Sequence, residues 1–225
     1  MSLKTLVNYD DPNSFASRLR KKRSRYLEEV ISAIASRNGS CRILDLGGTH
    51  AYWNIFPETW FENLSIKITL LNLNRVSIPE RANTRFCSVS GDACNLSEYA
   101  DDAFDLVHSN SVIEHVGSWD RMCSMAKESL RVGKRVYLQT PYFWFPVEPH
   151  FLTPFVHWLP LSVRAWLACK VAMGNWPRAT SIDEAVRAQQ SSMLLDKRML
   201  QSMMPAASIR FERFLGLPKS LIAIA

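Results

Sequence analysis

A predicted tight turn with two glycines is the feature of this sequence best suited to binding a ligand. The run Ile43-Leu44-Asp45-Leu46-Gly47-Gly48-Thr49-His50 ends a short apolar segment in an acid and two glycines. This pattern is typical of a buried parallel strand that turns directly into a helix. Glycine permits the φ angles of such a turn and lacks the Cβ that would keep a ligand from the main chain. The N–H groups at a helix N-terminus attract an anion such as a carboxylate. We therefore expect a nucleotide-like ligand beside Gly47 and Gly48.

Polar residues follow three further expected strands. Asn72 ends the second strand, where its side chain could reach the two hydroxyls of a ribose. Asp92, in Gly91-Asp92-Ala93, follows the third strand and could accept a hydrogen bond from an exocyclic amine such as that of adenine. Asn110 and Ser111 follow the fourth strand, next to the reacting end. An open α/β sheet binds its ligand at the carboxyl ends of its strands, so these residues are expected to lie at one edge.

Two histidines are candidate general bases, because imidazole titrates near neutral pH and can take the proton of a hydroxyl. His150 is the first candidate, with Glu148 as the group that orients it; the alternative is that His150 only hydrogen-bonds a loop carbonyl. His115, which follows Glu114, is the second; the alternative is a helical residue that covers the ligand. The other histidines, His50, His108 and His157, are expected to have no chemical role.

The elements that must position these residues alternate between strands and helices. Apolar runs predict strands at 41–46, 66–73, 85–89, 103–108 and 135–139, and a closing hairpin of 208–214 and 220–224 that turns at Gly216-Leu217-Pro218. Helices are expected at 14–36, capped by Asn13 or Ser14, and at 119–130, 161–173 and 181–200. The first helix should bury Phe15, Leu19, Tyr26, Val30 and Ile34, which recur at helical spacing. This order predicts a doubly wound, mainly parallel α/β sheet with an antiparallel end.

Taken together, these segments resemble the class I S-adenosylmethionine-dependent methyltransferases over roughly residues 43–139, including Phe104-Asp105-Leu106-Val107 as the fourth strand. The resemblance implies a Rossmann-like sheet of seven strands, with one reversed near an edge. It implies that Asp45, Gly47, Gly48 and Thr49 hold the methionine part of S-adenosylmethionine, that Asn72 binds its ribose and that Asp92 and Ala93 bind its adenine. Asn110 and Ser111 would border the sulfonium.

The run Ser111-Val112-Ile113-Glu114-His115-Val116 resembles the small-molecule branch of that family, which includes ubiquinone-pathway O-methyltransferases. Some of these relatives place an acid three positions before the Glu-His pair and bind a metal there. Ser111 stands at that position, so we predict no metal. Two other residues depart from the family pattern. Thr49 replaces the second loop glycine, and Asn72 replaces the usual acid with an amide, which hydrogen-bonds hydroxyls less strongly than a carboxylate does.

The resemblance predicts O-methylation of a small molecule, such as a sugar, a polyketide-like compound or a lipid-linked hydroxyl. A nucleic-acid methyltransferase is a second hypothesis, because residues 1–42 carry nine basic and four acidic side chains. Amino-methylating enzymes of that class have an Asn/Asp-Pro-Pro-aromatic run after strand four, where this chain has Asn110-Ser111-Val112-Ile113, so nucleic acid is not the expected substrate. A non-catalytic, cofactor-binding partner subunit is the third hypothesis.

We expect a single domain over 1–225: a basic helix in 1–38, a cofactor-binding core in 40–140, an aromatic loop and helical substrate lid in 141–205 and the hairpin in 206–225. Residues 141–160 hold seven aromatic side chains and five prolines, which predict a stiff, irregular loop. That loop could form a second core, the wall of a substrate pocket or a contact with a membrane surface.

The composition narrows the cellular setting. Five scattered cysteines without a C-x-x-C pair predict neither a zinc site nor a disulfide framework, and favour a reduced, cytoplasmic protein. The first residues lack the apolar stretch of a signal peptide, and no run is long enough for a membrane-spanning helix. The sequence leaves the oligomeric state open.

Overall fold

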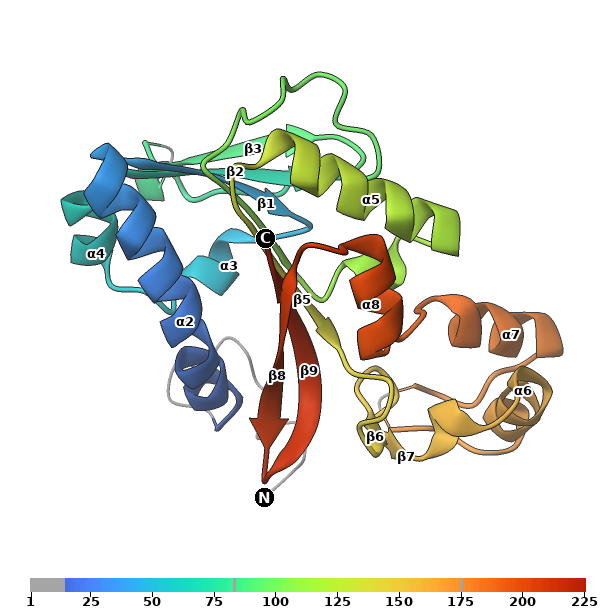
Figure 1. The fold of residues 1–225 in the computed structure, drawn as a ribbon. Coiled ribbons are helices and arrows are strands. Elements are labelled where there is room, and N and C mark those ends of the chain that lie inside the picture. Colours follow the sequence, from blue (N-terminus) through green and yellow to red (C-terminus); the bar gives the residue numbers. More distant parts are fainter. Residues whose placement is uncertain (1–14, 83, 175) are drawn as a thin grey trace. The chain divides into compact units, whose positions relative to one another are not determined.

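The computed structural model describes residues 15–82, 84–174 and 176–225 (Figure 1). The chain divides into two compact units. The core unit comprises Met1–Asn110 and Glu128–Leu138, and the second unit comprises Ser111–Lys127 and Gln139–Ala225. The second unit thus includes the expected lid, 141–205, and the closing hairpin. No helix among the described residues is both long enough and apolar enough to cross a bilayer.

The strands form the sheet that the sequence predicts. Seven strands lie in the order β3-β2-β1-β4-β5-β9-β8. The strands are β1 (Cys41–Leu46), β2 (Ile66–Asn72), β3 (Phe86–Ser90), β4 (Leu106–Asn110), β5 (Val136–Pro141), β8 (Ser208–Phe214) and β9 (Leu217–Ile224). β1 pairs in parallel with β2 and β4, and β2 with β3, whereas β8 and β9 are antiparallel. β5 is buried at every position, including the polar residues Gln139 and Thr140 near its carboxyl end. The Rossmann-like fold with an antiparallel C-terminal hairpin is confirmed.

Within the described ranges, the core unit contains three helices and a 3-10 turn that come before β3 in the chain. They are α2 (Phe15–Asn38), α3 (His50–Trp53), α4 (Glu58–Asn63) and a 3-10 turn at Glu80–Ala82. Helix α5 (Trp119–Val132) begins in the second unit and ends in the core unit. The helical elements that follow β1 and β2 are short, so the carboxyl ends of these strands lead into turns and loops rather than into long helices.

The buried face of α2 differs from the expected one. Ser24, Leu27, Ile31 and Ala35 are buried, whereas Tyr26, Val30 and Ile34 are only half-buried. Both sets have helical spacing, and packing against β1 selects the face one position away from the predicted one (Figure 1). The expected caps Asn13 and Ser14, and the side chains of Phe15 and Leu19, lie outside the described residues.

The second unit has its own small core. It contains a 3-10 turn at Ile113–His115, β6 (Val147–Glu148), β7 (Thr153–Pro154), a 3-10 turn at Val156–Trp158, α6 (Leu161–Lys170), α7 (Ile182–Gln190) and α8 (Lys197–Met203). The core residues are Phe151, Val156, Ala165, Ala168, Met173, Ala179 and Ala185. Part of the aromatic loop therefore does form a second core.

The single helix predicted over 181–200 is wrong: the structure has two helices there. Ser181 caps α7 by accepting a hydrogen bond from Glu184 N (3.1 Å), and Asp196 caps α8 by accepting one from Met199 N (2.8 Å). The backbone between them bonds elsewhere, with Met193 N donating to Glu114 O (2.7 Å). These tertiary bonds replace helical ones and end α7. The helix predicted over 161–173 likewise ends at Lys170.

The turn of the closing hairpin also lies earlier than predicted. Leu217 and Pro218 already belong to β9 and pair with Phe214 and Arg213. The turn residues are Leu215 and Gly216, with φ of +48° and +84°. Two consecutive positive φ values are typical of the tight turn that matches the twist of an antiparallel pair.

Candidate functional site

The glycine turn follows β1 as the sequence predicts. Gly47 has a φ of +71°, in the left-handed region that favours glycine. A Cβ on Gly48 would lie 1.7 Å from Asp45 Oδ2, so glycine at this position makes room for a carboxylate of the protein itself. Thr49 precedes α3, a helix of a single turn, and makes no side-chain cap. The main chain at 47–48 therefore carries no side chain, which fits a ligand lying against it.

Asp45 is the buried anchor of this turn. It is 1% exposed, and its two carboxylate oxygens lie 2.7 Å from Trp53 Nε1 and 2.7 Å from His108 Nδ1. The parallel register of β1 and β4 places Asp45 directly beside His108. Both oxygens are thus occupied by protein groups, and Asp45 shapes the turn from within. Its direct contact with the cofactor stays a prediction. His108 is buried, and its lack of a chemical role likewise stays a prediction.

Asn72 and Asp92 lie at the carboxyl ends of β2 and β3. Asn72 is the last residue of β2, and its side-chain amide donates to Gly48 O (2.9 Å), which ties the glycine turn to the neighbouring strand. Asp92 Oδ1 accepts a hydrogen bond from Cys94 N (3.0 Å), and Ala93 is buried. β1, β2 and β3 are adjacent, so an uncovered backbone, an amide and a carboxylate follow three neighbouring strands. This donor and acceptor set fits an adenosyl cofactor.

Asn110 ends β4 in the core unit, and Ser111 begins the second unit. Ser111 has a φ of +57°, a conformation that costs energy in a residue with a Cβ and is concentrated at functional sites. Two hydrogen bonds to Gln139 hold Ser111 in this conformation. Ser111 N donates to the Gln139 carbonyl, and Ser111 Oγ donates to Gln139 Oε1, each at a distance of 3.0 Å.

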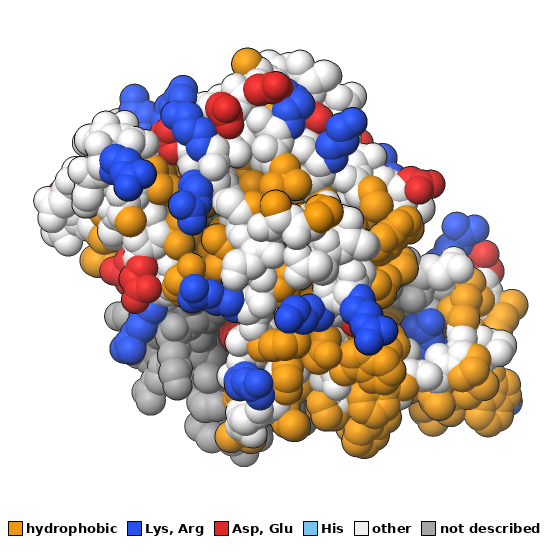
Figure 2. All heavy atoms as spheres, viewed as in Figure 1, with side chains coloured by type: hydrophobic (Ala, Val, Ile, Leu, Met, Phe, Trp, Pro, Cys, Tyr) orange, Lys and Arg blue, Asp and Glu red, His pale blue; other side chains and the backbone are white. Residues whose placement is uncertain are grey.

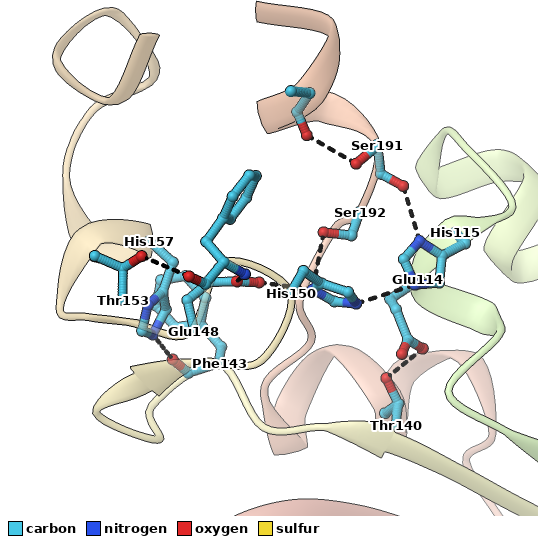
Figure 3. Close-up of polar contacts among 12 residues, drawn as sticks. Glu114, His115, Thr140, Phe143, Glu148, His150, Thr153, His157, Ser191 and Ser192 are labelled. Atoms are coloured by element: carbon cyan, nitrogen blue, oxygen red, sulfur yellow. Dashed lines mark hydrogen bonds and ion pairs between the residues drawn. The ribbon is translucent and has the colours of Figure 1, made fainter. Parts of the chain in front are cut away.

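The two candidate bases meet each other in the second unit (Figure 3). His150 Nε2 lies 3.0 Å from His115 Nε2. His150 Nδ1 lies 2.6 Å from Glu148 Oε1, and His115 Nδ1 lies 2.9 Å from Ser191 O. Glu148 is 2% exposed, and its other oxygen accepts a hydrogen bond from Phe151 N. The pair, which we call the histidine dyad, is therefore held at both ends by acceptors.

Those acceptors determine where the protons lie. The Ser191 carbonyl can only accept, so His115 carries its proton on Nδ1, and an ionised Glu148 likewise requires a proton on His150 Nδ1. The two Nε2 atoms then form a hydrogen bond only when the dyad holds one additional proton. Burial lowers the pKa of both rings, but in His150 the hydrogen bond and charge of Glu148 outweigh burial and raise the pKa. Of the two rings, His150 is therefore the one that favours the additional proton.

Glu114 lies beside the dyad and is buried, at 1% exposure. Its Oε2 accepts a hydrogen bond from Thr140 Oγ1 (2.9 Å), and burial raises the pKa of Glu114 to about 7. Glu114, His115 and His150 bring ligand-type atoms within 4.8 Å of one another. A metal ion or a shared proton would each suit this cluster, and the sequence-based expectation that no metal binds stays a prediction.

A cavity of about 590 Å³ lies within the second unit. Its apolar wall consists of Phe143, Trp144, Phe151, Met193 and Met199, and Glu148 of the dyad's hydrogen-bond chain also lines it. Gln189 lines the cavity at 3% exposure, and neither its amide nitrogen nor its amide oxygen has a hydrogen-bond partner in the described part of the chain. Buried polar groups are nearly always paired, so Gln189 marks a place where a ligand can supply the partner.

Two parts of this arrangement were not predicted from the sequence. The bonds from Asp45 to His108 and Trp53 could have been found by aligning the two apolar strands in parallel register, because His108 then falls beside Asp45. The contribution of Gln189 and Arg164 to the cavity had no signal in the sequence. Arg164 Nε is buried without a partner among the described residues, and burial lowers the pKa of Arg164.

Comparison with known proteins identifies the family. Residues 18–193 match the methyltransferase domain family, so the chain belongs to that family. It is an enzyme that uses S-adenosylmethionine as the methyl donor. No curated protein sequence matches the chain.

Solved structures share the fold at low sequence identity. A SAM-dependent methyltransferase from Archaeoglobus fulgidus is 12% identical, with a TM-score of 0.52 over 92% of this chain and 93% of that one. The PH0226 protein from Pyrococcus horikoshii is 16% identical, with a TM-score of 0.51 over 98% and 95%. An O-methyltransferase family protein from Burkholderia thailandensis is 11% identical, with a TM-score of 0.49; the match covers 98% of this chain but only 63% of that longer chain.

Proposed function

We propose that this methyltransferase methylates a hydroxyl group of a small molecule bound in the cavity of the second unit. The observation that carries the proposal is the pairing of that cavity with a proton-accepting group: Glu148 lines the cavity and also holds His150 of the histidine dyad. Methylation of a hydroxyl needs both a binding pocket and a place for the hydroxyl proton.

The cofactor supplies an electrophilic methyl group on a sulfonium sulfur. The chain's own residues bind the reactants and hold the proton. Deprotonation of the dyad leaves lone pairs on His150 Nε2 and His115 Nε2, which then repel each other instead of sharing a proton. An acceptor hydroxyl that donates to one of them relieves this repulsion. With the cofactor bound, its methyl group would pass to the acceptor oxygen and its sulfur would leave as the neutral thioether; the hydroxyl proton would move to the dyad, where Glu148 would stabilise the charge.

The cavity lining indicates the class of acceptor. Phe143, Trp144 and Phe151 provide flat apolar walls, which suit an acceptor with an aromatic or otherwise planar body. Gln189 offers an unpaired donor and an unpaired acceptor, and Arg164 offers a charged donor. An acceptor with a carboxylate or another planar polar group would satisfy both side chains.

Two binding and activity measurements test the proposal. Calorimetry should detect heat for S-adenosylmethionine and for its demethylated product. Methyl transfer from labelled cofactor should occur to a panel of planar hydroxylated compounds and not to RNA. Transfer to RNA alone would support the nucleic-acid alternative, whereas cofactor binding without transfer to any acceptor would support a non-catalytic partner subunit.

The dyad is tested by substitution and by pH. His150→Ala should lower kcat and leave cofactor affinity unchanged. Because Glu148 raises the pKa of His150, kcat/KM should rise with pH through a value above 6.5. Glu148→Gln should shift that rise to lower pH. Full activity of His150→Ala, or a pH profile that Glu148→Gln does not move, would remove the dyad as the base.

A further inference from the structure

The second unit exposes an unusual concentration of large apolar side chains. Six of them are Trp144 (55% exposed), Phe155 (54%), Trp158 (39%), Leu159 (38%), Val163 (39%) and Trp166 (57%), which we call the aromatic face. Figure 2 shows hydrophobic side chains gathered over β6, β7 and α6, toward the lower right of the view. Single exposed apolar residues are ordinary, but a group of this kind on one surface indicates an interaction site.

The rings of Trp144, Phe155 and Trp158 form the contiguous part of the aromatic face. The ring of Trp158 lies 6.1 Å from that of Trp144 and 5.2 Å from that of Phe155, measured between centroids. Leu159 follows directly, and Val163 and Trp166 are three residues apart on α6, so they share one side of the helix. Phe155 has a φ of +61°, and its N–H donates to Pro146 O (2.7 Å). The fold therefore keeps this ring outward at a cost in backbone strain.

Within the segment that carries most of the aromatic face, the charged side chains have one sign; the acids that follow it, Asp183 and Glu184, lie in the first turn of α7 and are already bonded to Arg187 and Thr180. Residues 149–182 contain no Asp or Glu, whereas they contain Arg164, Lys170 and Arg178. Lys170 and Arg178 are exposed. A surface that combines tryptophans with exposed basic residues, and whose nearest acids along the chain are already partnered, complements the interface of an anionic bilayer, where indole rings settle at the level of the headgroups. A protein partner of mixed charge would be expected to meet acidic as well as basic groups at the rim.

We propose that the aromatic face is a docking surface for an anionic lipid bilayer. Trp144, Phe155, Trp158 and Trp166 insert into the interface, and Lys170 and Arg178 contact the negatively charged headgroups. Trp144 also lines the cavity, so docking brings one wall of that cavity to the bilayer. The docking itself does not depend on which acceptor the enzyme methylates.

Co-sedimentation of the full chain with vesicles tests the docking. The chain should bind vesicles of equal parts phosphatidylcholine and phosphatidylglycerol, bind phosphatidylcholine alone much less, and lose affinity as salt is raised. Phe155→Asn combined with Trp166→Ser should weaken binding on the order of tenfold or more, because both lost side chains are inserting groups. Lys170→Gln combined with Arg178→Gln should weaken binding only to the anionic vesicles.

Leu73 and Leu215 provide the matched control. They are 73% and 88% exposed and lie outside the aromatic face, so Leu73→Ser and Leu215→Ser should leave vesicle binding unchanged. Cofactor affinity, measured on every variant, reports the fold independently. Absence of wild-type binding to anionic vesicles, or equal losses in the control variants, would overturn the proposal. So would a wild-type dimer that Phe155→Asn and Trp166→Ser dissociate, because the face would then bind a second copy of the chain.

Discussion

Glu114 couples the stability of the protein to pH. Its carboxyl is almost completely buried, and one oxygen, Oε1, has no hydrogen-bond partner among the described residues. Burial raises the pKa of Glu114 to about 7, against 4.5 for an ordinary glutamate. Between these values the native state keeps a proton that the unfolded chain has lost. The free energy of unfolding should therefore fall as pH rises through this window and level off above it.

The size of this effect follows from the shift. The difference between about 7 and 4.5 is about 2.5 units, and at about 1.36 kcal/mol per unit it corresponds to about 3 kcal/mol. Glu114→Gln keeps the shape of the side chain and an oxygen that can accept from Thr140 Oγ1, but it cannot ionise. The variant should therefore match the wild type in stability at about pH 4 and exceed it by about 3 kcal/mol at about pH 8.

Urea unfolding at a series of pH values provides the measurement. The quantity of interest is the difference between variant and wild type. It includes a smaller contribution from His150, whose pKa the charge of Glu114 helps to raise. Glu29→Gln is the matched control, because Glu29 is exposed on α2, and its difference should not vary with pH. A Glu114→Gln difference that stays constant from acid to alkaline pH would refute the reasoning. So would a variant less stable than the wild type at high pH.

Three further outcomes are expected. Gly48→Ala should lower the free energy of unfolding by about 3 kcal/mol and weaken cofactor binding in calorimetry, because its Cβ would displace the Asp45 carboxylate. Gly91→Ala, whose Cβ would meet the side chains of Leu71 at 3.2 Å and Glu98 at 3.4 Å, should lower the free energy of unfolding much less. Gln189→Leu removes an unpaired buried amide, so it should raise the free energy of unfolding by about 1–3 kcal/mol and also raise the KM for the acceptor. Gln190→Leu, at the exposed neighbouring position, should not raise the free energy of unfolding. Chelators should leave methyl transfer unchanged, since the dyad is proposed to work through a proton; loss of activity restored by one metal would contradict this.

Local sequence patterns predicted the sheet well, because its determinants are local. Each parallel strand is a short apolar run, and Gly47 and Gly48 end the first one in a turn that few other residues allow. Asn72, Asp92 and Asn110 could be placed at the carboxyl ends of strands for the same reason, since a parallel sheet brings those ends to one edge. The closing hairpin was also predicted, although its turn lies at Leu215 and Gly216.

Helix packing was less predictable, because several faces of one helix satisfy the same spacing. On α2, Leu27 and Ile31 are buried where Val30 and Ile34 were expected. The break after α7 depends on Met193 bonding to Glu114, a residue far away in the chain. Such competing partners are invisible to a pattern that counts only neighbours along the sequence.

The sequence by itself determined that the chain forms a methyltransferase sheet with a bare turn after its first strand. It also singled out Glu148, His150 and His115 as candidates, but it could not show that they act together. Only the tertiary structure brings His115 and His150 into contact. It also decides which aromatic side chains are buried and which are exposed. The physical reason is that hydrophobic period and turn chemistry operate over a few residues, whereas hydrogen bonds and burial depend on segments that meet only after folding.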